Sequence, residues 1–435
     1  MSNTCKLPVN ELKVGMYISN LDRSWLETPF LLQGFNLETE QDIVTVCEYC
    51  DHVYVDLSLS KHLENNSYKS TPRPLDQGGS NKSSLNKSTS NPNISDPTAS
   101  PRKSIKEIFA GKNLIPYADK FSWRNEFPKA QAAISSISEC VKGILSGSDK
   151  NFTLDMVKVK RAVEPMIESV TRNPDACIWL ARMKEKDDYT YHHSIGCSIW
   201  SVALGRQLGL QKAELRSLAI GGLLFDVGKL KLNKAILTSK KRLTDLEFQK
   251  IKQHVQIGTE LLKDSGIINQ DILNIVAFHH ERHNGKGYPN GLAGDDIPVF
   301  ARIAAIVDCY DAITSHRYYA KALPPAEAIK NLYEWKGIDF QAELVEEFIQ
   351  AVGIYPAGTL VELSSGEVAI VVAEYRSRRL RPQVMVLLDR NKAPLSEMKF
   401  IDLSNESNSI NGKLLEIVSS LEPEAYGINM MAIEL

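Results

Sequence analysis

Residues 279–291 read HHERHNGKGYPNG and hold the densest group of reactive side chains in this chain. The paired histidines His279 and His280 end an apolar stretch with helical spacing. Three glycines and a proline follow, which predicts a tight and open loop. Seven of the nine histidines fall between His192 and His316, a clustering that indicates a functional site there.

The bulk composition excludes several classes of protein. The chain has 435 residues, a formal net charge of −2 and 43% hydrophobic residues, which is typical of a globular protein with real cores. A near-neutral charge argues against a nucleic-acid polymer as partner. Without an apolar run of about twenty residues or an apolar leader, we expect no membrane span and a cytoplasmic location. Seven cysteines are then expected to be reduced thiols.

The periodicity of apolar residues changes along the chain and predicts a mainly α protein with small β parts at both ends. A Ser-, Asn-, Lys- and Pro-rich segment cannot bury enough apolar surface to offset its ordering entropy, so it is predicted to be disordered. The predicted parts are an α+β module at 1–58, a disordered linker at 59–104, a helical connector at 105–183, a helical bundle domain at 184–353, and an antiparallel β unit with a tail at 354–435.

Two polar residues fall on predicted core faces of the bundle. His193 recurs with Cys197 and Trp200 at helical spacing, so it is expected to face the core. Asp226 stands at the apolar end of the next helix, which Gly228 is predicted to terminate. A buried carboxylate there needs a cation, a set of hydrogen-bond donors or a metal ion.

Three further histidines border apolar helical rows. A helix is predicted to begin at the capping box of Thr244 and Glu247 and to carry His254 beside its apolar row. His279 continues the apolar row of the following helix, and His280 is its neighbour. Adjacent residues point about 100° apart on a helix. Both histidines therefore serve one site only if the helix frays there or if two metals flank it.

Asp308 and Asp311 are three residues apart in an otherwise apolar helix, where two carboxylates are costly without compensation. Singly, each of these polar residues is better explained as structural. Together they predict a helical bundle that holds divalent metals through imidazole and carboxylate groups. Such ligands suit iron or manganese better than calcium. The number of candidates exceeds the four of a structural zinc site, which favours two metals.

Several of these motifs together resemble the HD-GYP domain, a branch of the HD metal-dependent phosphohydrolases. The resemblance covers roughly residues 187–353 and rests on His193-Ser194, Asp226 followed by VGK, HHER at 279–282, GYP at 287–289 and DAITS at 311–315. The N-terminal segment resembles a small domain of unknown function that is commonly fused ahead of HD-GYP domains. The resemblance implies hydrolysis of the bacterial second messenger cyclic di-GMP to the linear dinucleotide or GMP.

The same resemblance assigns roles to individual positions. It implies the metal ligands His193, Asp226, His254, His279, His280 and Asp308. Catalytic roles fall to Asp226, as a bridge between two ions, and to Lys229. Substrate-binding roles fall to Arg317, Lys321, Tyr288 and Gly287. The implied partners are cyclic di-GMP and diguanylate cyclases with a GGDEF domain, and a homodimer is a further candidate assembly.

The chain departs from the family pattern at three positions. Phe225 stands where the HD motif has histidine, Tyr189 stands where members with three metals have glutamate, and Lys321 is displaced by one place. We therefore expect at most two metals, one of them weakly held, and a phosphodiesterase of reduced activity. The alternative is a catalytically inactive domain that binds a nucleotide or a signalling partner. A third interpretation keeps the hydrolase chemistry on another phosphate ester.

Overall fold

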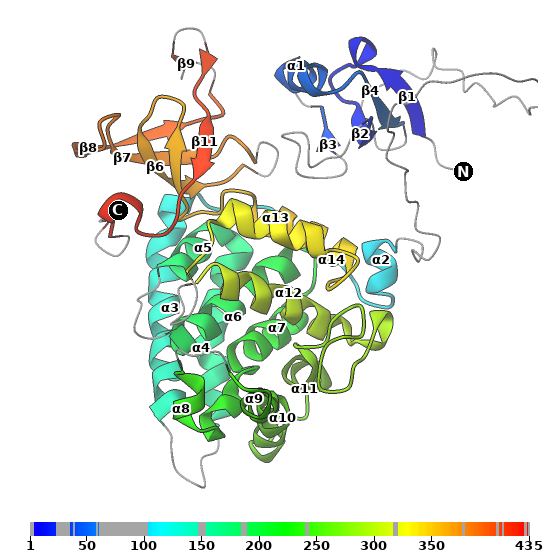
Figure 1. Cartoon of the computed structure of the whole chain (residues 1–435), viewed down its shortest axis with the longest axis vertical. Coiled ribbons are helices and arrows are strands. Elements are labelled where there is room, and N and C mark those ends of the chain that lie inside the picture. The colour runs from blue at the N-terminus through cyan, green and yellow to red at the C-terminus, as the bar shows by residue number, and fades with distance from the viewer. Residues whose placement is uncertain are drawn as a thin grey trace, which may run out of the picture. The chain divides into compact units, whose positions relative to one another are not determined.

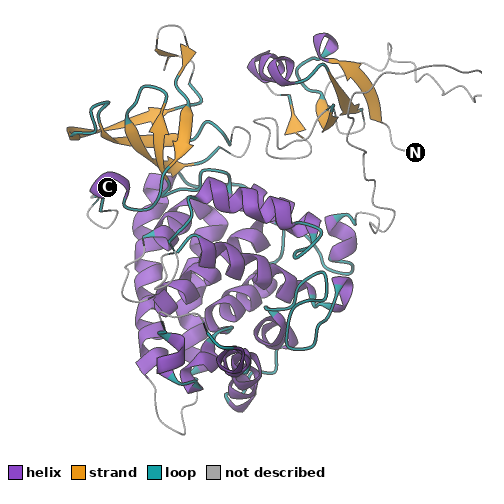
Figure 2. Cartoon of the chain, in the orientation of Figure 1, coloured by secondary structure: helices purple, strands orange, loops and turns teal. Residues whose placement is uncertain are grey.

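A computed structural model describes thirteen ranges of the chain, which form two compact units, Met1–Arg102 and Lys103–Leu435. The described residues are 4–22, 35–37, 40–57, 60, 103–146, 154–183, 189–239, 243–315, 321–375, 379–405, 409–410, 413–429 and 433. Most of the predicted disordered linker, residues 61–102, lies outside them. Figures 1 and 2 show the helices and strands.

The first unit is a small antiparallel sheet with one helix, as predicted for the N-terminal module. Its strands pair in the order β1-β4-β2-β3. Val53 and Val55 alternate with more exposed residues along β4 and are fully buried with Val46 of the helix, as expected for a half-buried strand. The elements are β1 (Thr4–Pro8), β2 (Tyr17–Leu21), β3 (Phe35–Asn36), α1 (Glu40–Tyr49) and β4 (His52–Asp56).

The second unit begins with a helical bundle built around α6 (Tyr189–Gln207), which packs against α3, α4, α5, α7, α12 and α14 (Figure 1). We predicted a single core-facing row on this helix. Instead, its described side chains from Tyr191 to Arg206 are buried on every face except at His192, because neighbouring helices surround it. A helix in this position brings His193 into the centre of the bundle.

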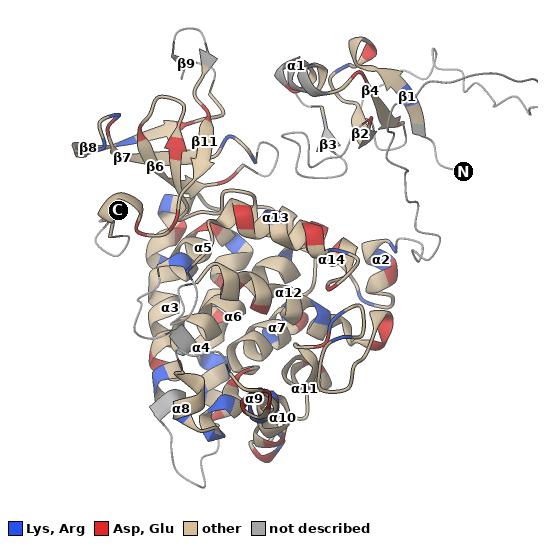
Figure 3. Cartoon of the chain, viewed as in Figure 1, with Lys and Arg blue, Asp and Glu red and all other residues tan. Residues whose placement is uncertain are grey.

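The helices around α6 have the following bounds: α2 (Ile105–Ile108), α3 (Trp123–Ser146), α4 (Met156–Arg172), α5 (Pro174–Arg182), α7 (Lys212–Leu224), α8 (Lys234–Leu237), α9 (Asp245–Lys252), α10 (His254–Asp264), α11 (Gln270–Phe278), α12 (Val299–Ile313), α13 (Pro325–Trp335) and α14 (Ala342–Val352). Lysines and arginines are interspersed with aspartates and glutamates over this body, in keeping with the small net charge (Figure 3).

One helix boundary near the candidate site differs from the prediction. α7 ends at Leu224, so Asp226 lies in the turn before the short helix η3 (Val227–Lys231) and Gly228 does not terminate α7. Gly228 is needed for close packing instead, because a Cβ there would lie 2.0 Å from the carbonyl oxygen of His254. The glycine thus lets the Asp226 turn pack directly on α10.

The helix predicted after Thr244 is two helices. Thr244 and Glu247 form the predicted capping box at the start of α9. α9 then ends at Lys252 and α10 begins at His254, with Gln253 as the junction. The break places His254 in the first turn of α10, next to η3.

The predicted C-terminal β unit is a five-stranded antiparallel sheet in the order β11-β5-β6-β7-β8. Apolar side chains of the sheet form its buried core. Its elements are β5 (Leu360–Leu363), β6 (Val368–Ala373), β7 (Gln383–Leu388), β8 (Pro394–Asp402), β11 (Ile417–Ser420) and the separate pair β9 (Ser409–Ile410) and β10 (Lys413–Leu414). Within the described ranges, every helix is too short or too polar to cross a membrane.

Candidate metal centre

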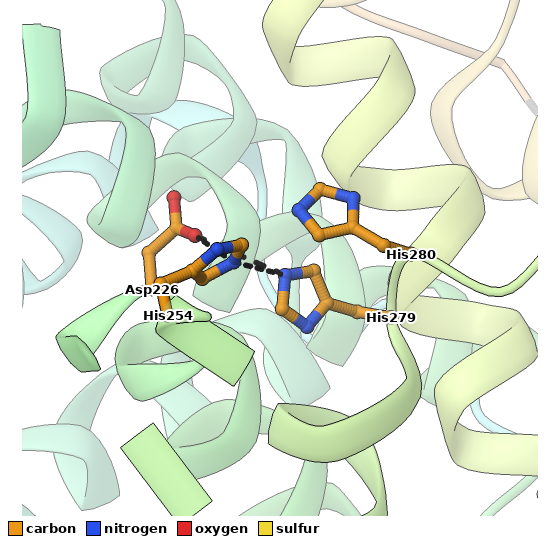
Figure 4. A group of neighbouring side chains, drawn as sticks. All are labelled: Asp226, His254, His279 and His280. Atoms are coloured by element: carbon orange, nitrogen blue, oxygen red, sulfur yellow. Dashed lines mark hydrogen bonds and ion pairs between the residues drawn. The ribbon is translucent and has the colours of Figure 1, made fainter. Parts of the chain in front are cut away.

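Four predicted ligands converge where the turn after α7, the start of α10 and the end of α11 meet. Asp226, His254, His279 and His280 offer ligand atoms that all lie within 4.8 Å of one another. Figure 4 shows the carboxylate and the three imidazole rings around a common centre. Their convergence comes from three separate elements, so it requires the assembled bundle.

Backbone carbonyls fix the orientation of two of these rings. Nδ1 of His254 lies 2.7 Å from the carbonyl oxygen of Ile251, and Nδ1 of His279 lies 3.1 Å from that of Val276. Because a carbonyl only accepts, each Nδ1 is assigned as the donor and each Nε2 keeps its lone pair. The two Nε2 atoms lie 3.4 Å apart and face the centre.

The surroundings of the Asp226 carboxylate indicate whether a metal ion fits this arrangement. Its buried Oδ1 has no hydrogen-bond partner among the described residues, although Nε2 of His254 lies 3.2 Å away and Nε2 of His279 lies 3.8 Å away. With both Nε2 atoms deprotonated, three electron pairs face one another in a buried space. A cation between them would satisfy all three acceptors. The residues present therefore fit a divalent metal.

Adjacent His279 and His280 reach one site because α11 ends at Phe278, and the chain leaves helical geometry at the pair. A frayed helix end was one of the two conditions under which the sequence predicted that both histidines serve one site. The rings lie 4.1 Å apart between centroids, and His280 Nδ1 is 3.7 Å from Asp308 Oδ2. His280 thus stands between the group around Asp226 and a second group around Asp308.

His193 and Asp308 complete the centre from α6 and α12. Nε2 of His193 lies 3.2 Å from Asp308 Oδ1 and 3.8 Å from Asp226 Oδ2. Nδ1 of His193 lies 2.8 Å from Oδ2 of the fully buried Asp311, whose Oδ1 accepts a hydrogen bond from Trp200 Nε1 at 3.0 Å. The Asp311 carboxylate thereby aims the Nε2 of His193 at the centre. All six predicted ligands are brought together.

The orienting role of Asp311 was not predicted, because the sequence indicated only a costly buried carboxylate and a residue of the 311–315 motif. The signal was present, because Asp308 and Asp311 are three residues apart and share a helix face. His193, Cys197 and Asp311 also form a close group of potential ligands. Burial raises the pKa of the Cys197 thiol to about 12, so it stays protonated, and Asp311 engages Nδ1 of His193. Asp311 of this second group therefore orients His193, which belongs to the first.

The electrostatics favour charged carboxylates at Asp226 and Asp308 and neutral imidazoles at His279 and His280. Burial would raise the pKa of Asp226, but Lys229, His254 and His193 together hold it well below its ordinary value. The pKa of Asp308 is likewise held low against burial by the neighbouring imidazoles of His193 and His280. Burial lowers the pKa of His279 to about 4 and that of His280 well below its ordinary value. These are the protonation states that bind divalent metals.

Phe225 occupies the side of the centre where the HD motif has a histidine. Its side chain is buried, with 1% exposed, and its ring centroid lies 4.6 Å from that of His279 and 5.6 Å from that of His193. The ring touches both groups of ligands and supplies no donor atom. A metal held beside His193 would therefore have one ligand fewer than the family pattern provides.

Lys229 and the glycine-rich loop border the centre. Nζ of Lys229 lies 2.5 Å from Asp226 Oδ2. The buried carboxylate of Glu281 accepts hydrogen bonds from the backbone N–H groups of Asn290, at 2.7 Å, and Leu292, at 3.0 Å, which closes the loop. Gly287 lies against the backbone, since a Cβ there would be 2.4 Å from the nitrogen of Arg282. The contacts described for Gly287 are with the backbone of residues 280–282, so they stabilise the loop conformation.

An aromatic and cationic group, made by Phe248, Lys252 and Tyr288, extends outward from His280. The Tyr288 ring stacks on the His280 ring with centroids 4.6 Å apart. Nζ of Lys252 lies 5.1 Å from the Tyr288 centroid and 4.8 Å from that of Phe248, which is 43% exposed. Phe248 and Lys252 were not predicted, because one turn of α9 reaches the loop only in the folded chain.

The remaining residues that the sequence singled out are not among the described residues of the metal centre. Arg317 lies outside the described residues, and so does the side chain of Tyr189, whose backbone begins α6. Lys321 is exposed and lines a pocket with residues 421–426 of the C-terminal segment. The pocket that Lys321 lines includes none of the six predicted metal ligands.

Three known families match successive parts of the chain. Residues 4–159 match a domain of unknown function, DUF3391, and residues 166–343 match the HD domain. Residues 360–426 match a KOW domain associated with the HD domain. The metal centre lies wholly within the HD match.

Curated relatives share these parts to different extents. Cyclic di-GMP phosphodiesterase PA4108 of Pseudomonas aeruginosa is 32% identical over 92% of this chain and 88% of its own length. The cyclic di-GMP phosphodiesterase response regulator RpfG of Xanthomonas campestris is 36% identical over 34% of this chain and 39% of its own. The 3'3'-cGAMP-specific phosphodiesterase 2 of Vibrio cholerae is 33% identical over 39% of this chain and 32% of its own.

Proposed function

We propose, from the premise that this chain belongs to the HD-GYP-like family of HD-domain proteins, that it is a metal-dependent phosphodiesterase that hydrolyses cyclic di-GMP. The observation that carries the proposal is the unpartnered Oδ1 of Asp226, which faces the Nε2 atoms of His254 and His279 in a buried space. The similarity to a cyclic di-GMP phosphodiesterase, which spans 92% of this chain, supports the choice of substrate.

The six converging residues would hold two ions, with the carboxylate of Asp226 shared between them. One position has His254, His279 and His280 around Asp226, and the other has His193 and Asp308. Mixed imidazole and carboxylate ligands favour iron or manganese. Bound ions in such a centre make water a nucleophile near neutral pH and offset the negative charge that develops on phosphoryl oxygens.

The residues around the centre then act on the phosphodiester. Water adds to phosphorus, the ester bond from phosphorus to a ribose oxygen breaks, and that oxygen takes a proton. Lys229, held beside Asp226, is placed to donate to a phosphoryl oxygen or to the leaving oxygen. Arg317 and Lys321 are proposed to bind the second phosphate, a role that suits the planar fork of arginine.

The group of Phe248, Lys252 and Tyr288 is proposed to receive a guanine base. It begins at the ligand His280, so a nucleotide whose phosphate lies at the metals can extend its base along it. Exposed Phe248 offers a ring face for stacking, and Lys252 offers a cation to an anionic ligand. Gly287 contributes by permitting the loop geometry that places Tyr288 on His280.

Phe225 favours a second candidate function, in which the domain binds cyclic di-GMP or a signalling partner without turnover. Loss of one nitrogen donor would weaken the metal position beside His193, and the proposed reaction uses both ions. Diguanylate cyclases with a GGDEF domain are the proposed protein partners, and a homodimer is the proposed assembly. In both functions the same centre recognises the phosphate.

The proposed function is tested by anaerobic purification of the full chain, reconstitution with iron or manganese, and separation of the products from cyclic di-GMP. We expect the linear dinucleotide or GMP, and loss of product after chelation of the metal. 3'3'-cGAMP, tested in parallel, distinguishes the named substrates of the relatives. Bound but unchanged nucleotide would contradict hydrolysis and support the second function.

A further inference from the structure

The pocket that Lys321 lines lies where the helical body meets the C-terminal segment. Its volume is about 600 Å³, and its other lining residues are 421–426, which follow β11. This volume is in the range of small-molecule sites, and such sites are frequent where two parts of a fold meet. Lys321, Glu422 and Tyr426 are exposed, so a ligand can enter the pocket from solvent.

Both walls of this pocket are held by backbone hydrogen bonds. Two residues after Lys321, the N–H of Leu323 donates to the carbonyl oxygen of Ile313 at 2.8 Å, at the end of α12. Asp308 lies five residues earlier in α12, about 7.5 Å along the helix axis. On the other wall, the N–H of Leu421 donates at 2.8 Å to the carbonyl oxygen of the first residue of β5. A dinucleotide with one phosphate at the metal centre can therefore extend toward this pocket.

The ring of Tyr426 is the aromatic group of the pocket. Tyr426 is 52% exposed, and Nζ of Lys392 lies over its ring, 5.2 Å from the centroid. The same ammonium donates to Oε1 of Glu362 at 2.5 Å and to the carbonyl oxygen of Gly366 at 2.8 Å. Lys392 is therefore fixed to the β sheet and helps to hold the ring in place, while the exposed part of the ring stays available to a ligand.

The turn that carries this tyrosine has an uncommon backbone conformation. The N–H of Ala425 donates to the carbonyl oxygen of Glu422 at 3.1 Å. Glu424 and Tyr426 have φ of +65° and +57°. Residues other than glycine rarely adopt this left-handed region, and residues held in it are frequent at ligand-binding sites. The turn places Glu422 and Tyr426 at the same pocket.

The side chains of the pocket match the chemistry of a guanine nucleotide. The ammonium of Lys321 suits a phosphate, and the exposed tyrosine ring suits a stacked base, since every base has a flat π face. An ionised carboxylate only accepts hydrogen bonds. Guanine presents two adjacent donors, N1–H and N2–H, on its pairing edge, whereas adenine presents the acceptor N1 there. Glu422 therefore favours guanine over adenine.

We propose that this pocket is the subsite for the second guanine base of cyclic di-GMP. Tyr426 stacks on the base, and Glu422 accepts hydrogen bonds from its N1–H and N2–H groups. The inference rests on the proposed function, which places the first base at Phe248 and the second phosphate at Lys321. It adds a role for the C-terminal segment, which is to give the substrate site its preference for guanine.

The experiment measures KM for cyclic di-GMP with the full chain reconstituted with Mn²⁺, or Kd if the wild type binds the nucleotide without turnover. We expect Tyr426→Ala to raise this constant about tenfold, as loss of one stacked base does. Tyr426→Phe keeps the ring and should raise it less. Activity toward bis(p-nitrophenyl) phosphate, which has no base, should fall far less in Tyr426→Ala than activity toward cyclic di-GMP.

The preference for guanine is tested with cyclic di-AMP, measured as a competitor of cyclic di-GMP. We expect the wild type to prefer cyclic di-GMP. Glu422→Gln should reduce that preference about tenfold, because a glutamine amide can donate to adenine as well as accept from guanine. Glu397→Gln, at an exposed position of β8 outside the pocket, is the matched control and should keep the preference.

Two results would overturn the inference while the proposed function stands. In one, Tyr426→Ala has the wild-type constant for cyclic di-GMP, or Glu422→Gln has the wild-type preference. In the other, Tyr426→Ala loses activity toward both substrates alike, which shows that the residue serves the fold rather than a base. Circular dichroism checks folding, and Glu422→Gln decides if Tyr426→Ala does not fold. A wild type that neither hydrolyses nor binds cyclic di-GMP would contradict the proposed function itself and this inference with it.

Discussion

The metal centre has two halves whose rings are held in different ways. In the local half, His254 and His279 donate to carbonyls within four residues of themselves. In the tertiary half, His193 depends on Asp311, which is 118 residues away in the chain. Helix geometry alone orients His254 and His279, whereas His193 is oriented only in the assembled bundle. The tertiary half is therefore easier to perturb. It is also the half in which Phe225 stands in place of the histidine of the HD motif and supplies no nitrogen ligand.

The largest expected effect comes from removing the carboxylate of the tertiary half. Asp308→Ala should strip bound metal and lower turnover by at least about 100-fold, because losing a ligand costs no less than losing an outer-shell partner. Elemental analysis and hydrolysis assays measure the two effects. Asp264→Ala, at an exposed position of α10, is the control. Unchanged metal content in Asp308→Ala would rule out the site assignment.

Restoring the missing donor should have the next largest effect. Phe225→His should raise metal occupancy and turnover on the order of tenfold, since the ring lies against both His193 and His279. Phe225→Leu is the control, because it changes the ring without adding nitrogen. If the histidine variant gains neither occupancy nor turnover, position 225 is not what limits the tertiary half.

The smallest expected effect concerns the group that extends outward from the local half. Phe248→Ala should raise KM for cyclic di-GMP about fivefold, the lower range for loss of one stacked base. Turnover of bis(p-nitrophenyl) phosphate, which has no base, should be unchanged. Leu246→Ala, with 78% of the side chain exposed on the same helix, is the control. Equal effects on both substrates would exclude base stacking at Phe248.

The sequence predicted most of what local rules decide. The capping box of Thr244 and Glu247, the mainly α bundle and the small β parts follow from periodicity and side-chain hydrogen bonding, and all are present. The six ligand candidates were singled out by their positions on apolar helical rows and given ligand roles by the resemblance, and the bundle gathers them around Asp226. Their metal-binding roles stay predictions, and so do the domain boundaries.

What was missed depends on contacts between distant segments. Apolar spacing continues through Asp226, so it gave no sign that α7 ends at Leu224 and that the Asp226 turn packs on α10. Long-range packing of this kind leaves no periodic signature in the sequence.

The most direct test of the two-half account is a titration of the metal-free wild-type chain with Mn²⁺, followed by elemental analysis and repeated with Asp311→Asn. We predict two ions per chain, one bound tightly and one weakly. We also predict that Asp311→Asn weakens only the second ion, by about 10- to 100-fold. A single ion, two ions of equal affinity, or equal weakening of both by Asp311→Asn would contradict it.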